Sequence, residues 1–384
     1  MERESHVEVE DSPSIEYILR PITYISWLMG VGVARPRKCP KAITIFIRIV
    51  HLAVCSISAM YCVLDFFSFN SIFAFKTNVY KLMHCTNRVI SYVAAYYYVC
   101  HGIRQHNKWP ELMDRMKNLD QKIRRETSIN VLPIKNAQVL AILATFACCP
   151  LSLIAHVLYY YFTNPEYIFI SDLLFYFILA QSLINSFVFD IVVYVLYCRF
   201  QTINKLIGQM DELFGAQQIA LKIRRIRGLH NGISDLVVMI NDIHGLHLLL
   251  LSTNCFAVVV ATLFRIYIGI TEKNYTLIAV LNGCWILYVT QFGLICWICT
   301  LSRQESERTG IIIYGFVLNC KNLDQDAGVR NEINDFSIQL QQYQAAFTAC
   351  NFFEMNNALF SGLVGVISAY LVILIQFYKP SDSN

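Results

Sequence analysis

Few residues in this sequence have types and spacings suited to chemistry. Cys296 and Cys299 have the Cys-x-x-Cys spacing found in metal and redox sites, but no second Cys or His pair accompanies them. Packing in an apolar core is therefore the favoured interpretation. No nucleophile, general base and orienting group can be assigned to one common site. We predict that the protein is not an enzyme and that it holds no metal and no cofactor.

The composition instead indicates a membrane protein. Of the 384 residues, 56% are hydrophobic and only 15% are charged, and the mean hydropathy is +0.46, whereas a soluble domain carries about a quarter charged residues. An apolar helix needs about 20 residues to cross a bilayer. Seven apolar segments reach that length: roughly 43–68, 78–100, 137–162, 173–198, 246–270, 277–301 and 350–377. We predict an all-α membrane protein with seven transmembrane helices.

The distribution of basic residues predicts the orientation. Of the 31 Lys and Arg residues, 24 lie in the N-terminal segment and in the second, fourth and sixth connections, and only Lys76, Lys273 and Lys379 lie in the alternate set. Lys and Arg accumulate on the cytosolic side, so we predict a cytosolic N-terminus and an extracellular C-terminus. The sequon at Asn274 then falls in an extracellular connection, as a candidate glycosylation site. The short basic clusters give no support to nucleic acid as a partner.

Two cytosolic segments carry helical patterns outside the spans. Apolar residues from Ile219 to Ile240 keep a four-three rhythm that continues into the fifth span, which predicts one helix of about 50 residues. A second apolar seam precedes the last span at heptad spacing. It is formed by Val329, Ile333, Phe336, Leu340, Tyr343 and Phe347. Such a seam either packs within its own chain or anchors one subunit to another, and both alternatives stay open.

Gln376 lies at the outer end of the last span, directly after five aliphatic residues. An amide there is costly in lipid unless it faces protein or water. Helical turns lead back from Gln376 to Val372 or Ile373 and then to Ala369. In a symmetric assembly this narrow apolar face would line a pore. Alternatively, Gln376 sits among lipid headgroups beside Phe377.

Residues 369–377 read Ala-Tyr-Leu-Val-Ile-Leu-Ile-Gln-Phe. They resemble the C-terminal signature of the insect gustatory receptor family, which reads Thr-Tyr, five hydrophobic residues and Gln-Phe. The stretches Glu307–Gly310 and Phe347–Cys350 are also similar to the last third of that family. Ala369 departs from the signature, because Thr is usual there, and this puts a role of that hydroxyl in doubt.

The resemblance implies a ligand-gated, cation-permeable channel in the plasma membrane of sensory neurons. It implies a homotetramer, or a hetero-oligomer with related receptors, whose last helix lines the pore with Gln376 and Phe377 at the gate. The implied partners are a small-molecule tastant (a sugar, an amino acid or a bitter compound), permeating cations and membrane lipids. The expected regions are a cytosolic segment 1–42, a six-helix ligand-binding bundle 43–301, cytosolic anchor helices 302–349, a pore helix 350–377 and an extracellular tail 378–384.

Polar and aromatic residues in the outer half of the predicted spans are candidates for ligand contacts. A ligand pocket needs an apolar floor and a few fixed hydrogen-bonding groups. Arg88 lies near mid-bilayer, where it either serves function or forms a buried structural pair. Trp285 offers a flat apolar face and one donor, with core packing as the alternative. The complete set is Arg88, Tyr92, His156, Gln181, Trp285, Tyr288 and Gln291.

The main alternative is a seven-transmembrane G-protein-coupled chemoreceptor with no pore of its own. That class would place the N-terminus outside the cell, against the distribution of basic residues, and Asn274 in the cytosol. No Asp-Arg-Tyr motif ends the third predicted span. The ligand-gated channel is therefore the favoured hypothesis.

Overall fold

The structure is a computed structural model that describes residues 15–68, 78–126, 134–163, 170–209, 216–271, 273, 275–319 and 327–377. Most of the described chain is helical, and the all-α prediction is confirmed. In chain order the elements are α1 (Ile15–Leu28), α2 (Lys41–Ser68), α3 (Asn78–Arg104), α4 (Lys108–Glu126), α5 (Ile134–Leu143), the π-helical turn η1 (Ala144–Cys148), α6 (Cys149–Thr163), α7 (Ile170–Gly208), α8 (Ala216–Thr271), α9 (Tyr275–Asn319), α10 (Ala327–Gln342), β1 (Thr348–Ala349), β2 (Phe353–Glu354) and α11 (Asn357–Phe377).

The predicted spans correspond to helices of the described chain. Within it, α2, α7, α8, α9 and α11 are each long and apolar enough to cross a membrane. The second predicted span is α3, and the third is divided into α5, η1 and α6. Pro150 lies two residues after the end of the π-helical turn. Proline lacks the N–H group of a helical hydrogen bond and clashes with the preceding turn, which accounts for the irregularity at this point.

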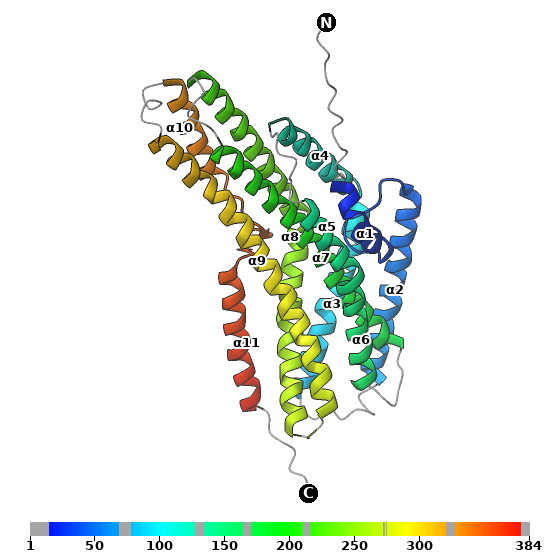
Figure 1. The fold of residues 1–384 in the computed structure, drawn as a ribbon. Coiled ribbons are helices and arrows are strands. Elements are labelled where there is room, and N and C mark those ends of the chain that lie inside the picture. The colour runs from blue at the N-terminus through cyan, green and yellow to red at the C-terminus, as the bar shows by residue number, and fades with distance from the viewer. Residues whose placement is uncertain are drawn as a thin grey trace.

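The bundle is centred on α7, which packs against α8 and α9. In an 18-residue apolar stretch of α7, 94% of the residues are buried, whereas the corresponding value for α11 is 6%. In Figure 1, α11 accordingly stands at the side of the bundle, next to α8 and α9. The last helix is therefore an outer element of the single chain.

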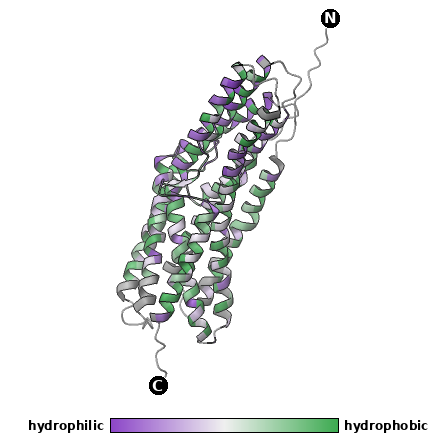
Figure 2. Ribbon diagram, turned by 90° about the vertical axis from the view of Figure 1, so that its left-hand side faces the viewer, coloured by the Kyte–Doolittle hydropathy of each residue, from purple (hydrophilic) through white to green (hydrophobic). Residues whose placement is uncertain are grey.

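Hydropathy divides the molecule along its long axis (Figure 2). Hydrophobic residues dominate the lower half of that view, and hydrophilic residues gather in the upper half, where α4, α10 and the extensions of α8 and α9 lie (Figures 1 and 2). The 56-residue helix α8 runs through both parts. This confirms the prediction of one continuous helix that runs from the apolar pattern at Ile219 into the fifth predicted span.

The last helix begins later than predicted. Residues 348–354 form an antiparallel hairpin of β1 and β2, and α11 starts at Asn357 instead of residue 350. Cys350 and Asn351 have φ angles of 51° and 61°, a left-handed conformation that a right-handed α-helix does not contain. The side chain of Asn356 then accepts a hydrogen bond from the N–H of Leu359 (2.8 Å), which caps the new helix.

Candidate functional site

α11 contacts the rest of the chain through one apolar stripe. Phe360 contacts Phe292 of α9, with ring centroids 6.4 Å apart. Near the other end, Tyr370 meets Phe256 of α8 edge-on at 5.4 Å. Helical spacing places further residues of the stripe against the core. These are Leu359, Leu363, Ile367 and Leu374.

The opposite face of α11 is uncovered in the single chain. Ala369, Val372, Ile373 and Gln376, which the sequence predicts as one face, are all exposed. Two residues advance a helix by about 200°, so this face points away from the stripe that packs on α8 and α9. The face is available to lipid, to water or to another copy of the chain. Phe377 ends the helix, and its side chain lies outside the described part of the structure.

The base of α11 is held by hydrogen bonds from two central helices. The side chain of Asn241 on α8 donates to the carbonyl oxygen of Ala346 (2.8 Å) and accepts from the N–H of Thr348 (3.1 Å). On α9, the hydroxyl oxygen of Thr300 accepts from the N–H of Asn357 at 3.0 Å. The segment that leads into α11 is therefore tied to the bundle at both of its ends. We call residues 346–357 the hinge segment.

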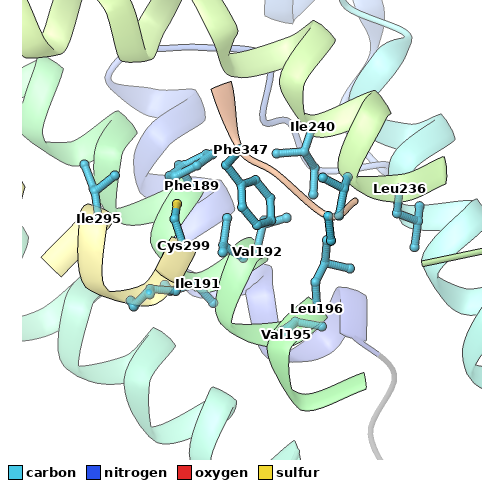
Figure 3. Close-up of a cluster of buried hydrophobic side chains, with 14 of the residues drawn as sticks. Phe189, Ile191, Val192, Val195, Leu196, Leu236, Ile240, Ile295, Cys299 and Phe347 are labelled. Carbon is cyan, nitrogen blue, oxygen red and sulfur yellow. The ribbon is translucent and has the colours of Figure 1, made fainter. Parts of the chain in front are cut away.

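A buried ring and an ion pair also seat the hinge segment. Phe347 meets Phe189 of α7 edge-on at 6.1 Å and lies among buried side chains of α7 and α8 (Figure 3). Arg303 of α9 forms ion pairs with Glu354 of β2 and with Glu307. All three central helices thus contact the segment from which α11 starts.

The predicted anchor seam packs mainly inside its own chain. Five of its six residues are buried or partly buried against the core: Val329, Ile333, Phe336, Leu340 and Phe347. The sixth, Tyr343, is 54% exposed. α10 ends at Gln342, so Tyr343 and Phe347 follow the helix instead of continuing its seam. Because a buried side chain cannot contact another subunit, this packing favours the intramolecular alternative.

Other apolar side chains are exposed on the parts of α9 and α10 that lie outside the predicted spans. Ile311 and Tyr314 lie one turn apart on α9 and are 73% and 64% exposed, and Ile338 of α10 is 51% exposed. Apolar groups gathered on a surface outside the membrane are typical of contact sites. Sequence reasoning missed Ile311 and Tyr314, because they follow the polar stretch 302–310 and lie outside the predicted span at 277–301. The signal that identifies them is their exposure.

His230 is buried in the part of α8 that precedes the predicted span at 246–270. Its ring contacts Phe200 of α7 and Phe336 of α10, with centroids 5.2 and 5.7 Å apart. Nε2 is 3.2 Å from the hydroxyl oxygen of Ser306 on α9. Burial lowers the pKa of His230 from 6.5 to about 4, although a hydrogen bond that the imidazole donates to the backbone of Ser306 acts in the opposite direction. The imidazole is therefore neutral at cytosolic pH.

Two of the predicted ligand residues come together between α2, α3 and α7. The guanidinium of Arg88 lies 5.2 Å from the ring centroid of Phe175, and the ring of Tyr92 lies 5.9 Å from the same ring. The hydroxyl of Tyr92 is 2.7 Å from that of Ser58, and Arg88 donates to the sulfur of Cys62 at 3.2 Å. This group combines a cation, hydroxyls and an apolar wall, which suits a small amphipathic molecule.

Three other predicted residues lie on α9. The indole N–H of Trp285 donates to the side chain of Asn282 one turn earlier (2.9 Å), so its donor is used within the helix. Tyr288 is buried, and Gln291 donates to a carboxylate oxygen of Asp190 on α7 at 2.6 Å. Sequence reasoning missed Asp190. A single carboxylate inside an apolar run is the signal that identifies it.

Gln181 lies apart from both groups. Its side-chain nitrogen donates to the carbonyl oxygen of Met29 (2.6 Å) and lies 3.3 Å from Nδ1 of His51. It therefore holds the segment between α1 and α2. The side chain of His156 and the whole of Asn274 lie outside the described residues. The predicted ligand residues that are described thus occupy three separate places.

The described residues contain a polar groove but no metal cluster. The groove has a volume of about 940 Å³ and lies between α4, α8 and residues 342–346, with Lys108, Asp242 and Tyr343 in its wall. No group of three or more His, Cys, Asp or Glu side chains in the described chain could hold a metal ion. Cys296 and Cys299 are free thiols, and both are buried in the core.

Comparison with known proteins relates this arrangement to a family. The sequence profile of the 7tm chemosensory receptor family matches residues 19–379. Gustatory receptor 23a of Drosophila melanogaster is 26% identical over 172 residues, which are 44% of this chain and 45% of that receptor. The gustatory receptor for bitter taste 66a of the same species is 25% identical over 174 residues, which are 44% of this chain and 32% of that receptor. Both matches cover less than half of the relative.

A solved structure has the same fold. The insect olfactory receptor OR5 from Machilis hrabei, in complex with eugenol, matches with a TM-score of 0.64 at 13% sequence identity, over 94% of this chain and 98% of that chain. The predicted seven-helix membrane fold is thereby confirmed. Because the family profile covers almost the whole chain, the family resemblance of residues 369–377 is confirmed as well. This chain belongs to the 7tm chemosensory receptor family.

Proposed function

We propose that the chain is a tastant-gated, cation-permeable channel in the plasma membrane of sensory neurons. The observation that carries this proposal is the exposed face of α11. This helix is the most apolar of the candidate spans and the least buried. Its outward face carries aliphatic side chains and then an amide, Gln376, and an amide in that place is favoured where it meets water or protein. A central pore between copies of the chain provides both.

In this proposal four copies surround one axis, each with a cytosolic N-terminus. Ala369, Val372 and Ile373 form the aliphatic constriction, and Gln376 and Phe377 form the gate. A narrow apolar constriction blocks ions by losing its water and conducts when the helices separate. Homotetramers, or assemblies with related receptors, use the same arrangement.

Contacts between subunits in the cytosol involve Ile311, Tyr314 and Ile338 in this proposal. These side chains are exposed on α9 and α10, whereas the seam that the sequence predicts as an anchor is mainly buried in its own chain. The described chain therefore offers this surface, and not the seam, to a second copy. Pairing of apolar side chains between copies removes their area from water.

The tastant binds in the outer half of the bundle near Arg88 and Tyr92. It is a sugar, an amino acid or a bitter compound. The support for this position is the group that these residues form with Phe175, Ser58 and Cys62. A ligand that changes the packing of α7 also changes the contact of Phe189 with Phe347. The hinge segment would carry that change to α11. Trp285, with Tyr288 and Gln291, remains a second candidate position on α9.

Current recording from cells that express this chain alone tests the proposal. A panel of sugars, amino acids and bitter compounds is applied, and at least one compound is expected to evoke a cation current. Gln376→Ala is expected to change the ion selectivity or the resting leak. Gln341→Ala, the same substitution at an exposed position of α10, should change neither. Currents that are the same for wild type and Gln376→Ala across several cations would remove Gln376 from the pore.

The G-protein-coupled alternative gives a different result in the same cells. A channel opens in an excised membrane patch without GTP, because the ligand site and the pore belong to one assembly. A receptor without a pore needs a cellular G protein and a separate channel. Tastant currents that vanish in GTP-free patches would contradict the proposed function.

A further inference from the structure

Two arginines are buried without an anionic partner. Arg48 on α2 is 1% exposed, and Arg35, in the segment between α1 and α2, is 9% exposed. Among the residues that the structure describes, none of the three guanidinium nitrogens of Arg48 has a hydrogen-bond partner, nor has Nε of Arg35. Within the described chain no carboxylate forms an ion pair with either residue. Burial of a guanidinium without a partner is strongly unfavourable.

The chain pairs its other buried guanidinium. Arg199 of α7 is also buried, and its Nε lies 2.6 Å from a carboxylate oxygen of Asp120 on α4. Asp242, which acts electrostatically on His101 together with Arg48, is itself ion-paired with Lys108. The nearby carboxylate is thus already used. Two neighbouring buried cations therefore lack the compensation that Arg199 has.

The surroundings of Arg48 are shaped to hold its guanidinium. A Cβ atom on Gly102 of α3 would lie only 1.3 Å from Nη1 of Arg48, so the absence of a side chain at Gly102 makes room for that group. Arg35 is close enough to act on Arg48 electrostatically. The two guanidinium groups therefore share one neighbourhood, between α2, α3 and the segment 29–40.

We propose that Arg35 and Arg48 bind a phosphate group at the cytosolic end of the bundle. The location rests on the proposed orientation, in which the start of α2 and the end of α3 face the cytosol. Guanidinium groups match phosphate with paired, charge-assisted hydrogen bonds, and two of them balance its multiple charge. The inner leaflet supplies anionic headgroups, and the cytosol supplies free phosphate compounds. The basic residues Arg37 and Lys38 form the exposed end of the covering segment.

Thermal unfolding of the purified full-length chain tests this site and separates the two sources. The chain is placed in nanodiscs of phosphatidylcholine alone, in the same nanodiscs with soluble inositol trisphosphate, or in nanodiscs that contain phosphatidylinositol bisphosphate. We expect the unfolding temperature to rise when phosphate groups are present. A rise only with the phospholipid identifies a headgroup as the source, and a rise with the soluble compound identifies a free phosphate.

Variants separate phosphate binding from a structural role. Arg48→Gln and Arg35→Gln should each raise the half-saturating phosphate concentration by about tenfold or more, because each removes a charge-assisted contact. Gly102→Ala keeps both charges, and its methyl group should weaken binding by displacing the guanidinium. Lys122→Gln removes an exposed charge of α4 and should bind as the wild type does.

Stability without phosphate provides the decisive contrast. Arg48→Gln should then unfold at the same temperature as the wild type or higher, because the substitution removes an uncompensated buried charge. A wild type that does not respond to any phosphate source would overturn the proposal. An unchanged response of Arg48→Gln would overturn it too, as would a loss of stability in that variant without phosphate. These measurements use no current, so their outcome is independent of channel activity.

Discussion

At the scale of single residues, the sequence identifies the unusual polar groups but not their partners. Gln291 is predicted as a ligand contact because it is a hydrogen-bonding group in the outer half of an apolar span. Its partner, however, is Asp190, 101 residues away on another helix. Likewise, Gln181 is predicted for the outer half, whereas it bonds to the backbone of Met29. Such pairings depend on how the helices pack against one another. The apolar periodicity of one helix does not identify its contacts on another helix.

His230 gives a prediction of pH dependence at this scale. The unfolded chain binds a proton at this residue below pH 6.5, whereas the folded chain does so only near pH 4. The free energy of unfolding should therefore decrease as the pH falls from 6.5 to about 4 and then level off, by about 3 kcal/mol in total from this residue. His230→Gln removes this titration and should flatten that part of the profile. Unfolding temperatures of the purified protein between pH 7.5 and pH 4 measure the effect.

A second histidine provides the control for His230. His106 is only partly buried, so His106→Gln should keep the pH profile of the wild type. If His230→Gln loses stability on acidification as steeply as His106→Gln does, then the buried imidazole is not the source of the pH dependence.

At the scale of elements, helices with an uninterrupted apolar rhythm are predictable from sequence and helix ends are not. α8 follows its pattern over 56 residues. The start of α11 and the end of α10 differ from prediction because of the intervening hairpin, in which Cys350 and Asn351 adopt left-handed conformations. Neither residue is a glycine, so the sequence carries no strong turn signal there. Tyr343 and Phe347 match the heptad spacing of α10 along the sequence. Both residues follow the end of the helix, so this spacing does not place them on its apolar face.

The hinge segment gives a prediction at the element scale. Asn241→Ala removes two hydrogen bonds between α8 and the base of α11, which are together worth about 1–3 kcal/mol. If the segment transmits ligand binding to the pore, the half-activating tastant concentration should rise by about tenfold. Surface labelling should be unchanged. Current recording over a range of tastant concentrations measures the shift.

Asn331→Ala is the matched control, since Asn331 is exposed on α10. Its response curve should overlay that of the wild type. A response curve of Asn241→Ala that also overlays the wild type, at equal surface expression, would show that the hydrogen bonds of Asn241 do not take part in gating.

At the scale of the whole molecule, the distribution of basic residues predicts the orientation in the membrane, and Asn274 provides a test of that prediction. The proposed topology exposes the sequon Asn274-Tyr275-Thr276 to the lumen of the endoplasmic reticulum during synthesis. Enzymatic removal of glycan should increase the gel mobility of the wild type and leave Asn274→Gln unchanged. A wild type without glycan, whose connection is protected from external protease, would contradict this orientation.

Assembly is the property of the whole molecule on which the proposed pore depends. Ile311 and Tyr314 are exposed on one face of α9, outside the predicted span, and the described part of the chain leaves them uncovered. Ile311→Glu combined with Tyr314→Glu places two like charges in the proposed contact, where their burial between subunits is unfavourable. Native mass spectrometry of the purified protein should show the wild type as a tetramer and the double variant mainly as smaller species. The control, Asn118→Glu with Gln121→Glu, adds the same charge at exposed positions of α4 and should remain tetrameric. If the double variant stays tetrameric, then these residues do not hold the subunits together. If the wild type itself is a monomer, then the outward face of α11 meets lipid, and the proposed pore cannot form.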